Sequence, residues 1–178
     1  MRSQKTRQMA EIALMSAVIC VLAPIAIPVP MSPVPISPAT FVVYLTAVLL
    51  GTKKGTVSVL VYLLLGMVGL PVFSGFSGGI GVLLGPTGGY LIGYLPCALV
   101  IGMLIKRGFR SIPSMVLGTL VCYLFGTIWF LAVMGGAYTW KQAILICIVP
   151  YLLFDAVKIF AAAAVAVPVE KMLRRIEL

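Results

Sequence analysis

The sequence contains no histidine, and it has only four acidic side chains against thirteen basic ones. Without histidine, HExxH metalloproteases, Ser-His catalytic dyads and imidazole-ligated metal sites are all excluded. Only 10% of the residues are charged, and no GxxxxGK[ST] phosphate-binding motif is present. The chain therefore carries few groups suited to catalysis and lacks the usual loop for nucleotide hydrolysis, which favours a non-enzymatic role without a cofactor.

Cysteine is also scarce, and its placement indicates neither a metal site nor a redox site. Each cysteine lies within an apolar run, and no two form a CxxC motif; the four are Cys20, Cys97, Cys122 and Cys147. Free cysteine in such surroundings behaves as a small buried hydrophobe. We therefore predict four buried thiols without metal-binding or catalytic function.

The sequence is rich in apolar residues, with 62% hydrophobic residues and a mean hydropathy of +1.18 over 178 residues. A soluble domain of this size could not cover so much apolar area with polar side chains. The net charge of +9 could suggest nucleic acid as a partner, but the basic residues lie at the ends of apolar runs. These features predict an integral membrane protein with one domain, embedded in a lipid bilayer and not bound to nucleic acid.

The apolar runs predict an all-α fold, a compact bundle of six transmembrane helices. Their ranges are 12–27, 39–50, 57–70, 87–105, 112–134 and 144–167. The first run follows a basic start without an obvious small-residue cleavage site, so we expect it to remain as a span. Twelve residues in the second run rise only about 18 Å, against a hydrocarbon core of about 30 Å. That run and the third either extend into flanking residues or do not cross fully.

The positions of the basic residues predict the topology of these helices. With a cytoplasmic N-terminus, eleven of the thirteen basic residues lie on the inside, whereas Lys141 lies outside and Lys158 within the membrane. Both termini are then cytoplasmic. The proline-rich segment 28–38 and the glycine-rich segment 71–86 become extracytoplasmic, and neither is expected to form a regular helix. Irregular backbone is tolerated near a membrane where it lines a cavity, so these segments predict a pocket open to the outside.

The last predicted span carries two ionisable side chains, Asp155 and Lys158. They lie three residues apart, so a helix places them on one face, together with Tyr151 one turn earlier. A charge at this depth costs about 2.5–3.5 kcal/mol on insertion scales. One interpretation is an intrahelical ion pair that only neutralises itself. The other is a ligand clamp, in which Lys158 attracts an anionic group and Asp155 accepts hydrogen bonds from N–H donors.

Other segments contribute weaker signals. Phe73, Phe76 and Tyr90 offer flat apolar surface suited to a compact ring. Ala13 and Ala17 form a small-xxx-small pattern, which permits close approach of another helix. The fifth predicted span has no ionisable group, and we interpret it as scaffold.

Three stretches together resemble the BioY family, the biotin-specific S components of energy-coupling factor (ECF) vitamin transporters. They are PVPIS…T at 33–40, LLLGMVGLPVFSGFSGGIGVLLGPTGGYLIGY at 63–94, and DAVK at 155–158. The similarity covers nearly the whole chain. The resemblance implies a six-helix membrane fold in a bacterial or archaeal cytoplasmic membrane, with an outward-facing biotin pocket and no catalytic activity of its own.

The resemblance also implies partners and site residues. Ala13 and Ala17 match the patch by which S components contact the transmembrane T component, and a pair of cytoplasmic ABC-type ATPases would hydrolyse ATP. The expected substrate-binding residues are Thr40, Phe73, Ser74, Phe76, Tyr90, Tyr151, Asp155 and Lys158. In that pocket the ureido N–H groups of biotin suit Asp155 and its carboxylate suits Lys158, although which side chain holds the carboxylate stays open. The family often has glutamine where this chain has Ala39, so only Thr40 is carried over from that segment.

Three alternatives stay open. The first is an S component for another vitamin, although cationic thiamin would not favour Lys158. The second is an intramembrane enzyme with Asp155 or Lys158 as base; its candidate partners Ser58, Ser114 and Glu11 are poorly placed. The third is a proton-coupled carrier or small channel.

Overall fold

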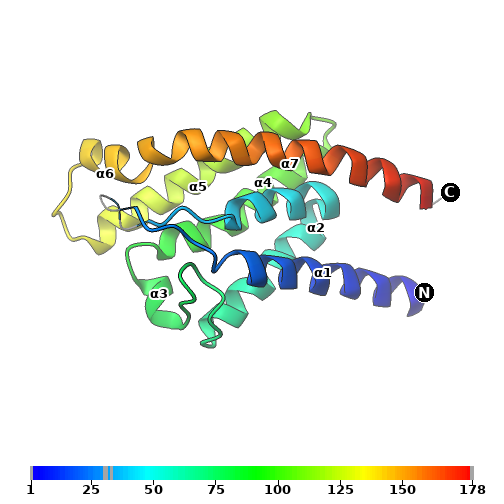
Figure 1. Ribbon diagram of the computed structural model, residues 1–178, viewed down its shortest axis with the longest axis horizontal. Coiled ribbons are helices and arrows are strands. Elements are labelled where there is room, and N and C mark those ends of the chain that lie inside the picture. Colours follow the sequence, from blue (N-terminus) through cyan, green and yellow to red (C-terminus); the bar gives the residue numbers. More distant parts are fainter. Residues whose placement is uncertain (1, 30–31, 33, 177–178) are drawn as a thin grey trace.

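The computed structural model describes residues 2–29, 32 and 34–176, and within them the regular secondary structure is helical (Figure 1). The helices are α1 (Arg2–Leu22), α2 (Ala39–Met67), α3 (Ile80–Leu84), α4 (Gly88–Lys106), α5 (Ser111–Val133), α6 (Trp140–Cys147) and α7 (Val149–Ile176). Extended pairing in this part of the chain is limited to two isolated bridges, Ile27–Ile36 and Phe73–Ser77. The predicted all-α fold class is confirmed.

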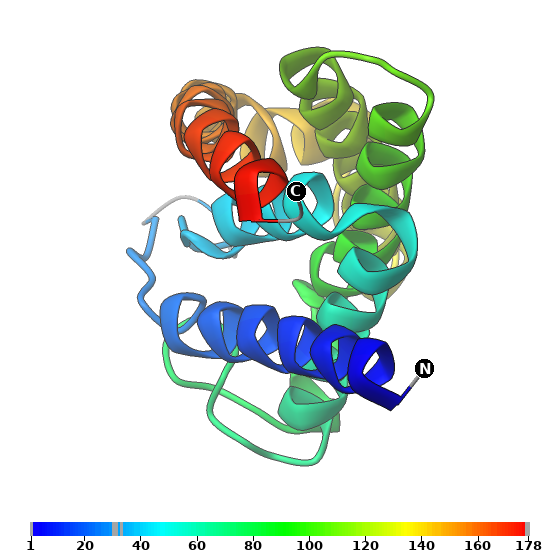
Figure 2. The same ribbon diagram turned by 90° about the vertical axis from the view of Figure 1, so that its right-hand side faces the viewer.

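The long helices form a bundle in which α2 and α4 are central. α4 packs against both α5 and α2, and α2 in turn contacts α1 and α7. The end-on view shows α1 and α7 on opposite sides of α2 (Figure 2). α1 begins and α7 ends at the same end of the molecule, whereas α3 and the described residues between α1 and α2 lie toward the other end (Figure 1).

A sharp turn at Gly51 divides α2 into the segments 39–50 and 52–67, and the chain changes direction there (Figure 1). Gly51 has φ 70° and ψ −171°, a conformation that residues with a Cβ rarely adopt. The predicted break between the second and third apolar runs is therefore present. It is shorter than expected, because Lys53 and Lys54 already belong to the second helical segment. Lys54 Nζ lies 2.5 Å from Glu11 Oε2 and links this segment to α1.

Four of the described helical segments are long and apolar enough to cross a membrane. They are Ala39–Met67, Gly88–Lys106, Ser111–Val133 and Val149–Val169. The first of these segments, α2, is bent at Gly51. The number of spans and their orientation stay predictions.

Three helix boundaries differ from those expected. The glycine-rich segment was predicted to lack a regular helix, and that prediction is wrong for α3, an apolar turn between Gly79 and Gly85. α1 begins at Arg2, ten residues before the expected start, and ends at Leu22, just before Pro24. The last run is interrupted at Ile148, which separates α6 from α7. Pro150 accounts for this break, because it has no N–H to continue the hydrogen bonding of α6 and is best tolerated in a first helical turn.

The contact of α4 with α5 depends on Gly126. A Cβ at this position would lie 2.2 Å from the ring of Tyr90 on α4, so the ring occupies the space that a side chain would need. We expect Gly126→Val to lower stability by about 1–3 kcal/mol through overpacking. Thermal unfolding of the purified protein in detergent would measure the loss. Gly81→Ala is the control, because a Cβ there meets no atom within 4 Å; equal losses in both variants would contradict this packing account.

Candidate functional site

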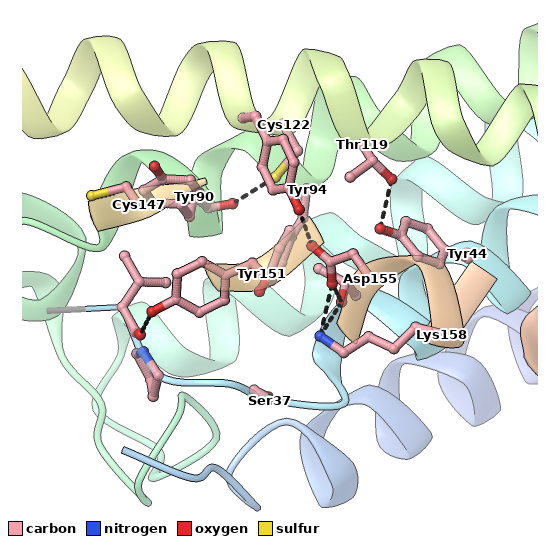
Figure 3. A pocket seen from close by; sticks show the side chains of 14 residues that line it. Ser37, Tyr44, Tyr90, Tyr94, Thr119, Cys122, Cys147, Tyr151, Asp155 and Lys158 are labelled. Carbon is pink, nitrogen blue, oxygen red and sulfur yellow. Dashed lines mark hydrogen bonds and ion pairs between the residues drawn. The ribbon is translucent and has the colours of Figure 1, made fainter. Parts of the chain in front are cut away.

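A pocket of about 50 Å³ lies among α2, α4, α5, α6, α7 and the proline-rich segment (Figure 3). We call it the inner pocket. It is lined by Val34, Pro35, Ser37, Thr40, Tyr44, Tyr90, Tyr94, Thr119, Cys122, Tyr123, Cys147, Tyr151, Asp155 and Lys158. Its volume has room for a few water molecules. Five phenols and a single acid–base pair give it a polar but nearly neutral lining.

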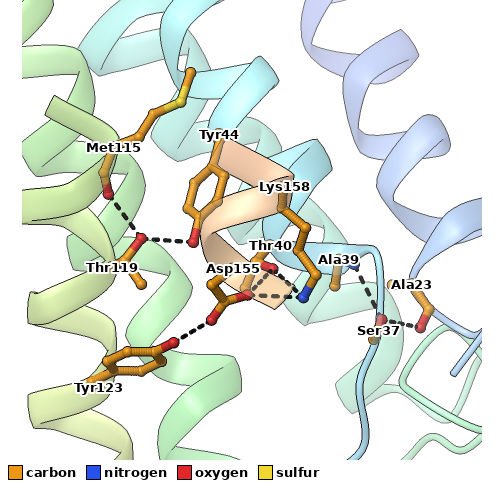
Figure 4. Close-up of polar contacts among 10 residues, drawn as sticks. All are labelled: Ala23, Ser37, Ala39, Thr40, Tyr44, Met115, Thr119, Tyr123, Asp155 and Lys158. Atoms are coloured by element: carbon orange, nitrogen blue, oxygen red, sulfur yellow. Dashed lines mark hydrogen bonds and ion pairs between the residues drawn. The ribbon is translucent and has the colours of Figure 1, made fainter. Parts of the chain in front are cut away.

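Asp155 is at the centre of the polar contacts in this pocket (Figure 4). Its side chain is 8% exposed, and its Oδ1 lies 2.9 Å from Lys158 Nζ. Its other carboxylate oxygen, Oδ2, accepts a hydrogen bond from the Tyr123 hydroxyl. Thr40 Oγ1 lies 3.0 Å from Lys158 Nζ and 3.4 Å from Asp155 Oδ1, so its hydroxyl forms hydrogen bonds with both charged groups. Three elements, α2, α5 and α7, thus hold one carboxylate in place.

The structure agrees with both interpretations of Asp155 and Lys158. The side chains form an ion pair, as the first interpretation requires, and both line the inner pocket, as the second requires. Burying an ion pair gives little net stability, because desolvation offsets most of the attraction. Stability alone therefore does not account for this pair at the wall of a pocket.

Further hydroxyl groups surround the pair. Thr119 Oγ1 donates to the Met115 carbonyl at 2.8 Å, so the Tyr44 hydroxyl, 2.6 Å from Thr119, is the donor in that contact. Tyr90 OH lies 3.1 Å from Thr127 Oγ1, and Tyr151 OH donates to the Val34 carbonyl. The last contact links α7 to the proline-rich segment. These bonds orient the phenols around the pocket without adding charge.

A second cavity adjoins the inner pocket. This middle hollow has a volume of about 230 Å³ and is lined by Val34, Pro35, Phe73, Ser74, Ser77, Val82, Thr87, Tyr90, Leu91 and Tyr94. It shares four residues with the inner pocket, namely Val34, Pro35, Tyr90 and Tyr94. The two cavities therefore lie next to each other, with these four residues between or around them.

The substrate-binding residues expected from the sequence fall into three groups. Those at the inner pocket are Thr40, Tyr90, Tyr151, Asp155 and Lys158. Phe73 and Ser74 border the middle hollow. Phe73 is fully buried and packs edge-on against Tyr62, with ring centroids 5.6 Å apart, so its ring belongs mainly to the core. Phe76 is 68% exposed and borders neither cavity.

Sequence reasoning missed several pocket residues. They are Val34, Pro35, Ser37, Tyr44, Tyr94, Thr119, Cys122, Tyr123 and Cys147. One available signal was the spacing of Tyr90 and Tyr94, which places both phenols on one face of α4. Thr119 and Tyr123 have the same spacing on α5, so the interpretation of this helix as scaffold alone is incomplete.

The structure also shows where the cysteines and the small residues of α1 lie. Cys97, Cys122 and Cys147 are buried and Cys20 is half-buried, all as free thiols. Within the described residues, no three Cys, Asp or Glu side chains come together as a metal site. Ala13 and Ala17 are exposed on α1, on the same side as Leu14, which is 64% exposed. Pro30 and Pro33 lie outside the described residues.

Tyr123 is expected to matter for binding because it fixes the carboxylate of Asp155. Tyr123→Phe removes the hydroxyl donor and leaves Asp155 Oδ2 without this partner. A hydrogen bond to a charged group contributes about 1.5–3 kcal/mol, so we expect ligand affinity to fall by about tenfold or more. Tyr138→Phe is the control, because Tyr138 packs against Phe130 outside the pocket. Equal affinities for both variants, measured by titration, would contradict a positioning role for Tyr123.

Comparison with known proteins places this geometry in context. A family model described as the BioY family matches residues 1–175. A biotin transporter BioY of Thermotoga maritima is 40% identical over 169 residues, which cover 93% of this chain and 97% of that protein. A probable biotin transporter BioY of Pyrococcus horikoshii is 38% identical over 162 residues, covering 91% and 95%. A crystal structure of the S-component for biotin from an ECF-type ABC transporter superposes with a TM-score of 0.88 at 29% identity, covering 96% of this chain and 94% of that one.

Proposed function

The chain belongs to the BioY family, and on that premise we propose that it is a membrane subunit that captures biotin from outside the cell for uptake by an ECF-type ABC transporter. The observation that carries this proposal is the Asp155–Lys158 pair at the wall of a pocket otherwise lined by uncharged groups. Such a pair offers both an acceptor and a donor to one small polar ring. The ureido group of biotin has the matching pattern of two N–H donors and one carbonyl oxygen.

Charge balance favours one orientation of the ligand. Asp155 and Lys158 already neutralise each other at 2.9 Å. A carboxylate beside them would leave one uncompensated negative charge in a poorly solvated site, which is costly. The neutral ureido ring adds no charge. We therefore place the ring at the pair, with one ureido N–H donating to Asp155 and Lys158 donating to the carbonyl oxygen, and direct the carboxylate toward the middle hollow. The sequence left open which of the two side chains holds the carboxylate, and in this orientation neither does.

The middle hollow suits the rest of the ligand. Biotin is too large for an inner pocket of about 50 Å³, so its apolar parts extend past Tyr90 and Tyr94 into the adjoining space. Ser74, Ser77 and Thr87 add hydroxyl groups to that wall, and Phe73 and Leu91 add apolar surface. In this proposal Phe76 makes no contact with the ligand.

Transport would require partner subunits. We assign Ala13 and Ala17 to the contact with the transmembrane T component, because both small side chains are exposed on one side of α1. A pair of cytoplasmic ABC-type ATPases would supply the energy, since the sequence has no phosphate-binding loop. The chain would lie in a bacterial or archaeal cytoplasmic membrane with both termini inside. The shared end of the molecule at which α1 begins and α7 ends supports this topology.

Direct titration tests the proposed function. The purified chain in detergent should bind biotin saturably at one site per chain, and it should not bind thiamin at the same concentrations. A cation such as thiamin would add positive charge beside Lys158. Preferential binding of another vitamin would point to a different S component. Absence of biotin binding by folded protein would refute the proposal.

A further inference from the structure

The site continues beyond the middle hollow toward the surface. A third cavity of about 330 Å³, which we call the outer hollow, is lined by Ala26, Pro28, Val29, Ser32, Pro35, Ser74 and Gly75. It shares Pro35 and Ser74 with the middle hollow. The inner pocket, middle hollow and outer hollow therefore form a series that leads from Asp155 to the space between the proline-rich and glycine-rich segments.

The lining of the two farther cavities has no charged side chain among the described residues. Its polar groups are the hydroxyls of serine, threonine and tyrosine. A site that recognises a carboxylate by its charge usually supplies arginine, lysine or a set of aligned N–H donors. No arginine or lysine borders either hollow within the described part of the chain, so the wall provides no fixed cation to bind a carboxylate there.

This wall has a consequence for the ligand, given the orientation proposed above. The carboxyl end of biotin points into the hollows, where no lysine or arginine among the described residues faces its negative charge. An amide in place of the carboxylate would keep the hydrogen-bonding capacity and remove only the charge. The outer hollow provides room for a group attached to the amide nitrogen.

We propose that the site accepts biotin extended at its carboxyl group, with biotin amides of an amino acid side chain, such as ε-N-biotinyl-lysine, as the class of ligand. The ring would stay at Asp155 and Lys158, the amide would lie in the middle hollow, and the amino-acid part would occupy the outer hollow. This inference rests on the proposed function, because it assumes that biotin binds ring-first.

The test compares two ligands on the purified full-length chain. We expect ε-N-biotinyl-lysine to bind within about 30-fold of biotin, which is about 2 kcal/mol. Removing one partner from a buried charge pair costs about 2–5 kcal/mol, so a site that holds the carboxylate by a cation would lose more than this. A loss greater than 30-fold would overturn the inference while leaving biotin binding intact. Failure of biotin itself to bind would instead refute the proposed function.

A pair of variants then locates the extension. Ala26→Trp places a large side chain in the outer hollow and should weaken ε-N-biotinyl-lysine at least tenfold more than biotin. Ile25→Trp is the matched control, because the neighbouring Ile25 is 55% exposed and borders none of the three cavities. Ile25→Trp should leave the ratio of the two affinities as in the unmodified chain. The same ratio in Ala26→Trp and Ile25→Trp would contradict the placement of the extension in the outer hollow.

Discussion

Replacement of Asp155 by asparagine is expected to lower the affinity for biotin by about 100-fold, because the carboxylate is the strongest acceptor in the inner pocket. The change keeps the size of the side chain and removes only its charge. Lys158 then loses its ion-pair partner at 2.9 Å, and Tyr123 loses a charged acceptor. The ureido N–H of biotin that faces this side chain would meet an amide oxygen, which accepts a weaker hydrogen bond.

Equilibrium titration of the purified variant measures this loss. Glu11→Gln is the matched control, since it makes the same carboxylate-to-amide change at a residue that pairs with Lys54 outside the pocket. We expect the control to bind biotin like the unmodified chain. If Asp155→Asn bound biotin equally well, Asp155 would not be the acceptor in the site.

Replacement of Lys158 by methionine is expected to impair both stability and binding. It leaves the Asp155 carboxylate buried without its cation, and breaking a buried pair costs about 3–5 kcal/mol. For a chain of this length each kcal/mol corresponds to about 2–4 °C in melting temperature, so we expect a decrease of about 10 °C. Biotin affinity should also fall sharply, because the donor to the ureido oxygen is lost.

The double variant Asp155→Leu/Lys158→Met separates the structural role of the pair from its binding role. Replacing a buried ion pair by apolar side chains is often neutral for stability. We therefore expect the melting temperature to return toward that of the unmodified chain, while biotin binding stays absent. Recovery of biotin binding together with stability would show that the pair only neutralises itself within α7.

The helices could be predicted largely from hydropathy, because long apolar runs in a membrane protein have few alternatives. The turn at Gly51 was indicated by the polar residues around it. The sequence did not indicate α3, because five apolar residues between glycines carry no periodic signal that distinguishes a short helix from a loop. The separation of α6 from α7 depends on Pro150, a residue also tolerated inside membrane helices, so the sequence did not fix the position of the break.

The site was predicted only where chemistry was unusual. Asp155 and Lys158 were identified because charge is rare within apolar runs. Tyr44 and Tyr123 were not identified, because a tyrosine in a membrane helix most often packs without a specific role. Their part in the site arises from tertiary contacts, since Tyr123 on α5 reaches Asp155 on α7 across 32 residues of sequence. Phe76 shows the opposite case, an aromatic side chain of suitable type that the fold places outside both cavities.

The central claim is that Asp155 accepts a hydrogen bond from one ureido N–H of biotin, and a cycle that changes both partners tests it most directly. Biotin and its two isomers methylated at one ureido nitrogen would be titrated against the unmodified chain and against Asp155→Ala. We predict that at least one isomer loses about 30-fold or more in affinity for the unmodified chain. The same isomer should lose much less for Asp155→Ala, which gives a coupling energy of about 1.5 kcal/mol or more. Equal losses in the two proteins for both isomers would contradict the claim.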